Sequence, residues 1–152
     1  TIKALSDLAT QLNGAVVMGH SQSGSFPLAA ALLNPSATRA LVLVEPGTCP
    51  ATYSDAEIAT LATLPVLIVF GDHRDTPTGI PSLPSWQDRY VACQALIGRL
   101  TRAGGAAEMF APPDRGIRGN SHMLMQDRNS LDIADVILQW IARRVPRAAS
   151  NN

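Results

Sequence analysis

The feature that most constrains this chain is a run of small and polar residues, Gly19 to Gly24, that separates two apolar segments. The short run from Ala15 to Met18 precedes it, and an uncharged stretch from Phe26 to Asn34 follows it. A buried strand that turns sharply into a helix has this order, and the turn lifts one side chain above the sheet edge with the helix N-terminus beneath it. The pattern therefore predicts a nucleophile elbow with Ser21 at its tip.

The spacing within this run departs slightly from the usual elbow. The elbow needs small residues two places on either side of the nucleophile, because the strand and the helix approach closely. Gly19 meets this need, whereas Ser23 stands where glycine is usual and Gly24 comes one place later. With Ser23 as the nucleophile, Ser21 and Ser25 would flank it, which fits the requirement less well. If the run from Gly19 to Gly24 has no catalytic role, it is a serine-rich turn that caps a helix.

Size and charge exclude several function classes. A chain of 152 residues fits one domain, 1–152, with a sizeable core. Its 12 basic and 12 acidic residues cancel, and the scattered arginines form no cluster that would predict nucleic-acid binding. No apolar run approaches the roughly 20 residues of a membrane span, and the first residues do not resemble a signal peptide. We expect a soluble protein with no nucleic-acid partner, no membrane span, no metal and no cofactor.

Short apolar runs alternate with helical patterns along the chain. Strands are predicted at 15–18, 40–44, 66–70 and 106–110, and helices at 2–12, 26–33, 54–61, from 85 to about 104, and from 129 or 130 to just before Pro146. Asn13-Gly14 supplies the stop of the first helix. Uniformly apolar strands that alternate with helices are typical of a parallel sheet covered on both faces. The predicted fold class is α/β.

The helix predicted after the proline-containing loop has a defined start. Ser85, with Asp88 three places on, resembles a capping box. The apolar stripe of this helix, from Trp86 to Leu100, is assigned to the core rather than to cofactor contacts. The loop before it, from Thr76 to Trp86, is either a wall or lid of a substrate pocket or a plain connection. Cys93 lies on the stripe, so it forms either a buried thiol or a disulfide with Cys49.

Candidate reactive residues follow the predicted strands. In an open parallel sheet such groups gather beyond the carboxyl ends of the strands. Those positions hold Ser21, Glu45, Asp72 with Asp75, and His122. Serine is a poor nucleophile at neutral pH unless a base takes its proton, and the base needs a carboxylate that fixes its tautomer. The chain supplies all three roles in the order serine, acid, histidine.

Among the three histidines, His122 is the predicted base. His20 adjoins Ser21, and neighbouring side chains on a strand diverge. His73 shares a turn with two candidate acids. His122 lies between the last predicted strand and the last predicted helix, where a loop can hold an imidazole over the elbow. A surface histidine without a role is the alternative.

The residues leave the choice of acid open. Asp72 follows the strand that usually supplies the acid in this architecture. Glu45 ends an apolar run, where its carboxylate needs a partner to offset desolvation, and the histidine would provide one. Glu45 could instead cap a helix or pair with an arginine. Asp72 and Asp75 also suit an Asx-type turn.

Three segments together resemble the α/β-hydrolase superfamily, and more narrowly a group of bacterial serine esterases with a Gly-His-Ser-Gln-Ser-Gly elbow. They are Gly19–Gly24, Val44–Gly47 and Gly119–Met123. In that group the acid is a glutamate after the strand that follows the elbow, which matches Glu45. The resemblance implies a small-molecule ester substrate and favours a secreted or periplasmic location.

The resemblance implies hydrolysis of a carboxylic ester through an acyl-enzyme. Ser21 would attack the carbonyl, His122 would carry the proton, Glu45 would orient His122, and the backbone N–H of Gln22 would bind the oxyanion. Acyl transfer by the same triad and a non-catalytic binding module are the alternatives. Thr1 as an N-terminal nucleophile is disfavoured by the helix predicted directly after it.

One departure from the superfamily concerns the strands that normally precede the elbow. The loop after the third of them supplies one oxyanion N–H, and this sequence starts only one helix before Ser21. Losing a single oxyanion donor lowers the rate by about 10²- to 10³-fold. We therefore expect only the carboxyl-terminal part of the fold here. The rest would come from preceding chain, or the sheet would be completed by another chain, including a second copy, that covers its apolar edge.

Overall fold

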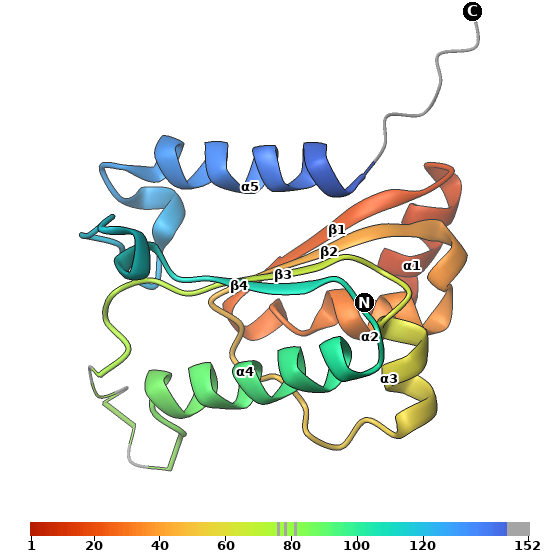
Figure 1. Ribbon diagram of the computed structural model, residues 1–152, viewed down its shortest axis with the longest axis horizontal. Coiled ribbons are helices and arrows are strands. Elements are labelled where there is room, and N and C mark those ends of the chain that lie inside the picture. Colours follow the sequence, from red (N-terminus) through yellow and green to blue (C-terminus); the bar gives the residue numbers. More distant parts are fainter. Residues whose placement is uncertain (76, 78, 81, 146–152) are drawn as a thin grey trace, which may run out of the picture.

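A computed structural model describes residues 1–75, 77, 79, 80 and 82–145 (Figure 1). Four strands form one sheet in the order β1-β2-β3-β4, so neighbours in space follow one another in the chain. All three pairings are parallel. The strands are β1 (Ala15–His20), β2 (Thr38–Val44), β3 (Val66–Val69) and β4 (Ala107–Phe110). Because the strands are parallel, the loops that follow them all leave from the same edge of the sheet.

Helices cover both faces of this sheet, as the α/β prediction requires (Figure 1). The helices are α1 (Ile2–Gln11), α2 (Phe26–Leu33), α3 (Asp55–Leu61), α4 (Trp86–Arg102) and α5 (Ser130–Arg144). Helices α1, α2, α3 and α4 contribute to the apolar cluster on one face, and α5, blue in Figure 1, lies on the other. Within the described part of the chain, none of the helices has the length and apolar character needed to cross a bilayer.

Side chains of the central strands alternate between two apolar clusters. Leu41 and Leu43 of β2 point into the cluster shared with the four helices, whereas Val42 points into the cluster beneath α5. The second cluster includes Ile137 and Trp140 of α5. A strand buried on both faces has no polar side, which explains the uninterrupted apolar runs in the sequence.

The ends of the elements differ from the predictions by a few residues. β1 continues beyond Met18 through His20, so the elbow starts later than the apolar run suggested. Asn13 and Gly14 have φ angles of 57° and 103°, and this left-handed pair ends α1 as predicted. Pro146, the predicted end of α5, lies outside the described residues.

Helices α3 and α4 each begin with a capping box. At α4 the Ser85 hydroxyl accepts the backbone N–H of Asp88, and the Asp88 carboxylate accepts the N–H of Ser85, which confirms the predicted start. Ser54 and Glu57 make the same pair at α3. Each box satisfies two N–H groups that the helix itself cannot pair.

A disulfide joins Cys49 to Cys93, with a Cα–Cα distance of 5.0 Å. The sequence had left open whether Cys93 is a free buried thiol or part of a disulfide, and the structure shows the disulfide. Cys49 lies in the loop that follows β2, and Cys93 lies in the middle of α4. The bond therefore ties that loop to the helix beneath the sheet.

The outer edge of β1 carries an exposed apolar side chain. Met18 is 51% exposed, although it belongs to a strand of the sheet. It lines an apolar groove of about 270 Å³ between this edge and α5. Val44, Leu124, Met125, Ser130, Ile133, Ala134, Ile137 and Leu138 complete the lining.

Candidate active site

Ser21 lies at the turn between β1 and α2. Its φ angle of 56° falls in the left-handed region that non-glycine residues seldom adopt. Its backbone carbonyl accepts two hydrogen bonds, from the N–H of Gly24 at 2.9 Å and from the N–H of Gly47 at 2.7 Å. Such a conformation persists only where the surroundings hold it. The two bonds provide that support on either side of the turn.

Close packing explains the two glycines of the elbow. A Cβ atom on Gly19 would lie 2.4 Å from the carbonyl oxygen of Ser23, and one on Gly24 would lie 2.5 Å from Cα of Pro46. Gly24 is thus required by the loop after β2 rather than by the helix. Ser23 is exposed, and its hydroxyl donates to the carbonyl of His20 at 2.9 Å. A small polar residue is therefore accommodated where the elbow usually has glycine.

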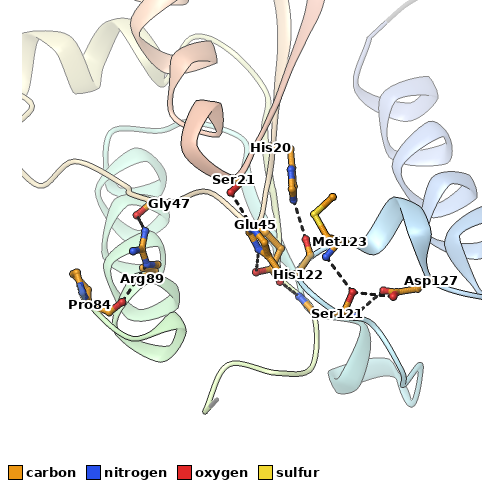
Figure 2. A network of polar contacts seen from close by, with 11 residues as sticks. His20, Ser21, Glu45, Gly47, Pro84, Arg89, Ser121, His122, Met123 and Asp127 are labelled. Carbon is orange, nitrogen blue, oxygen red and sulfur yellow. Dashed lines mark hydrogen bonds and ion pairs between the residues drawn. The ribbon is translucent and has the colours of Figure 1, made fainter. Parts of the chain in front are cut away.

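One imidazole links the predicted serine to the predicted glutamate (Figure 2). Nε2 of His122 lies 2.8 Å from Oγ of Ser21, and Nδ1 lies 3.2 Å from Oε2 of Glu45. With the Nδ1–H donating to the carboxylate, Nε2 is free to accept the hydroxyl proton. The three residues come from the loops after β1, β2 and β4.

The carboxylate of Glu45 is buried but satisfied. The residue is 4% exposed, and Oε1 accepts the backbone N–H of Gly71 while Oε2 faces His122. Its φ angle of 43° is again left-handed. A buried carboxylate without partners would be strongly disfavoured, and these contacts supply them. Glu45 is thereby fixed at the end of β2, beneath the imidazole.

The alternative acids lie elsewhere. Oδ2 of Asp72 accepts the backbone N–H of Gly119 at 2.7 Å, and the Asp72 N–H donates to the carbonyl of Asn120 at 2.8 Å. Asp72 therefore holds the loop that carries His122, rather than the ring itself. Asp75 is exposed. Of the candidate carboxylates, the structure brings Glu45 to Nδ1 of the imidazole.

The loop around His122 is anchored by side chains on both sides. Nε2 of His20 lies 2.8 Å from the backbone carbonyl of His122, to which it donates a hydrogen bond. Ser121 bonds both carboxylate oxygens of Asp127, through its N–H at 2.7 Å and its hydroxyl at 2.8 Å. The Ser121 hydroxyl also accepts the N–H of Met123 at 3.1 Å. Sequence reasoning did not predict these supports. The His20 contact depends on how the loop returns to β1, and the Ser121 contacts depend on how the loop folds on itself.

A cavity of about 220 Å³ opens beside the imidazole. Glu45, His73, Trp86, Ser121 and His122 line it. The ring of Trp86 lies 4.1 Å from the ring of His122, centroid to centroid, with an interplanar angle of 35°. Trp86 packs against the core cluster, as predicted for the α4 stripe, and it also lines this cavity. Of the predicted wall or lid, Thr76, Thr78 and Pro81 lie outside the described residues.

Gln22 directly follows Ser21 in the turn and is exposed. Its position above the N-terminus of α2 fits a backbone donor for a negatively charged oxygen. Within the described residues, no group of three or more His, Cys, Asp or Glu side chains is arranged to hold a metal ion.

The fold and this arrangement define the class: the chain has an α/β-hydrolase fold and contains part of it. A solved structure of a bacterial esterase matches with a TM-score of 0.83 and 45% identity over 94% of this chain. A poly(3-hydroxybutyrate) depolymerase from Bordetella parapertussis matches with a TM-score of 0.59 over 98% of the chain, and at 18% identity it bears on the fold alone.

A curated relative, named a probable secreted lipase, comes from Fungal sp. (strain ATCC 74256). It is 25% identical to this chain in an alignment that covers 93% of the chain. No family model matches the chain. The chain spans about half of each longer protein, 50% of the lipase and 42% of the esterase. The predicted resemblance to the α/β-hydrolase superfamily is confirmed, and the narrower one to esterases with the same elbow stays a prediction.

Proposed function

We propose that this chain carries the catalytic groups of a serine esterase that cleaves carboxylic esters. The observation that supports this most is the single imidazole in hydrogen-bond contact with both the Ser21 hydroxyl, at 2.8 Å, and the buried Glu45 carboxylate, at 3.2 Å. Relatives described as an esterase and a lipase support ester hydrolysis in general.

In the first half of the reaction, Oγ of Ser21 attacks the ester carbonyl while Nε2 of His122 takes the hydroxyl proton. The resulting imidazolium is stabilised by Glu45, which lies in a site of low exposure where a charge pair is weakly screened. The tetrahedral intermediate collapses, and the alcohol leaves with the proton from Nε2. The acyl group remains on Ser21.

In the second half, Nε2 takes a proton from water, and the resulting hydroxide attacks the acyl carbonyl. Collapse of this intermediate releases the carboxylic acid and returns the proton to Ser21 through His122. The backbone N–H of Gln22 binds the oxyanion in both halves. A second donor would come from a companion segment or from a second copy of the chain that pairs along the edge of β1.

Replacing Ser21 tests the proposal directly. In the natural protein that contains this chain, Ser21→Ala removes the nucleophile, and we expect turnover of short nitrophenyl esters to fall by at least about 10³-fold. Ser23→Ala is the matched control, because Ser23 is exposed and belongs to the same turn. It should retain turnover within a few-fold. Equal activity of Ser21→Ala and the natural protein would contradict the assignment.

The alternatives give different outcomes in the same assays. If an added alcohol or thiol outcompetes water for the acyl-enzyme, the protein is an acyltransferase that uses the same three residues. If a fluorophosphonate probe leaves Ser21 unlabelled in the natural protein, the chain belongs to a non-catalytic binding module.

We also propose that the protein works outside the cytoplasm. The disulfide between Cys49 and Cys93 supports this, since such bonds persist mainly in oxidising compartments. The lipase relative carries the word secreted in its name. Fractionation of the native host would test the location.

A further inference from the structure

Three residues of α4, namely Arg89, Cys93 and Arg99, hold the loop that follows β2. A guanidinium N–H of Arg89 donates to the carbonyl of Gly47, and Cys93 is bonded to Cys49. Further along the helix, Arg99 donates to the carbonyl of Tyr53 at 2.7 Å and to that of Ala51 at 3.0 Å. This loop begins at Glu45. Of these three contacts, the hydrogen bond from Arg89 to Gly47 is the nearest to Glu45 in sequence.

The contact of Arg89 continues into the elbow. Gly47, whose carbonyl accepts from Arg89, uses its own N–H to donate to the carbonyl of Ser21 at 2.7 Å. Both polar backbone groups of Gly47 are therefore occupied, one by the arginine and one by the strained serine. Figure 2 shows Arg89 reaching from its helix to this carbonyl. Ser21 is supported from α4 through a single intervening residue.

A second contact of Arg89 leads to the imidazole. Its Cζ atom lies 4.8 Å from the centre of the Trp86 ring, and that ring lies 4.1 Å from the ring of His122. Nε donates to the carbonyl of Pro84 at 3.3 Å, which holds the guanidinium beside the start of α4. A planar guanidinium with several donors makes such contacts together, whereas an ammonium group acts as a point charge.

We propose that Arg89 is a positioning residue that sets Ser21 and His122 relative to each other. It acts on the serine through Gly47 and on the imidazole through Trp86, without touching the reacting atoms. The inference rests on the esterase proposed above. Small errors in the alignment of reacting groups reduce catalysis steeply, by about 10²-fold for a misplacement near 1 Å.

The test compares two arginines of the same helix in the natural protein. Arg89→Ala should lower kcat for a nitrophenyl ester by about 10- to 100-fold with little change in KM, because alignment rather than binding is lost. Arg89→Lys should fall between this variant and the natural protein. Added methylguanidinium should restore part of kcat to Arg89→Ala. Arg99→Ala removes a similar helix-to-loop contact away from the elbow, and we expect a lower melting temperature with unchanged kcat.

The outcomes separate this inference from the function on which it rests. If the natural protein does not react with a fluorophosphonate, the proposed function itself is wrong. If it reacts and Arg89→Ala reacts at the same rate, only the role of Arg89 is wrong. A loss of kcat in Arg89→Ala that Arg99→Ala reproduces, or that methylguanidinium leaves unrestored in a folded variant, would also overturn it. Circular dichroism establishes whether each variant is folded.

Discussion

Two of the three residues in the hydrogen-bonded set have backbone conformations that L side chains seldom adopt. Ser21 and Glu45 have φ angles of 56° and 43°, and each directly follows a strand. Asn13 is the other such non-glycine residue in the described part of the chain, and it belongs to a helix stop. Strained residues concentrate at functional sites, where the surroundings hold them. At this site the two strained residues are the ones whose side chains contact the imidazole.

The acid can be identified by comparing two carboxylates. Glu45→Gln keeps the size of the side chain but removes the charge that stabilises the imidazolium, so we expect turnover to fall by about 10⁴-fold. Asp72→Asn should lose less than about 10-fold, because its amide oxygen can still accept the N–H of Gly119. Steady-state kinetics on a nitrophenyl ester decides between them. A larger loss in Asp72→Asn would reverse the assignment.

The sequence allowed the serine, the histidine and the competing acids to be predicted, because each follows a predicted strand. Position alone did not decide between the acids, since Glu45 and Asp72 both follow strands of a parallel sheet, and the preference for Glu45 came from the family resemblance. The contacts of Trp86 and Arg89 were missed for a different reason. In the sequence, both residues fit the pattern of a helix and carry no sign of a functional role. Their contacts with His122 and Gly47 depend on how α4 packs against the loops that follow β4 and β2.

At the scale of elements, α4 contributes Trp86 and Arg89 to the surroundings of the site. Trp86 is its first residue, so the capping box of Ser85 and Asp88 also fixes the indole beside His122. Within the described residues, strands and helices were predictable because their apolar periods differ. The ends of these elements were harder to predict. For example, β1 extends through Gly19 and His20, which have no strand-like pattern of their own.

Two matched caps give a test at this scale. Ser85→Ala and Ser54→Ala each remove the hydroxyl of a capping box, and each should lower the free energy of unfolding by about 1 kcal/mol. We expect only Ser85→Ala to lower ester turnover as well, because its helix starts at Trp86. Urea unfolding and kinetics on both variants provide the measurement. Equal turnover in the two would show that the cap of α4 has no bearing on the site.

The capping box of α4 should also respond to pH. The side chain and the backbone N–H of Ser85 hold the pKa of the Asp88 carboxyl below its usual value of 3.8. A lowered pKa in the folded state stabilises the protein above the unfolded value, and this contribution is lost as the pH falls through the folded value. Asp88→Asn should therefore be less stable than the natural protein at neutral pH, with the difference disappearing in acid. A difference that persists below both pKa values would contradict the charge-based explanation.

For the whole molecule, the disulfide is the main covalent constraint. It closes a loop with a sequence separation of 44 residues, which in the chain-entropy account is worth about 4 kcal/mol. The double variant Cys49→Ser/Cys93→Ser should be less stable by roughly this amount in urea unfolding. Adding a reductant should destabilise the natural protein and leave the double variant unaffected. Whether the two cysteines are bonded could not be decided from the sequence, because this depends on the path of the loop back to α4.

The exposed edge of β1 has a practical consequence for anyone who produces this chain by itself. The strand Ala15–His20 contains no proline, lysine, arginine or carboxylate, and Met18 stands open beside the groove under α5. Natural sheet edges usually carry such residues to discourage adhesion between copies. A recombinant preparation of the 152 residues alone is therefore expected to aggregate as it is concentrated. Coexpression with a segment that covers the edge of β1 should keep the protein in solution.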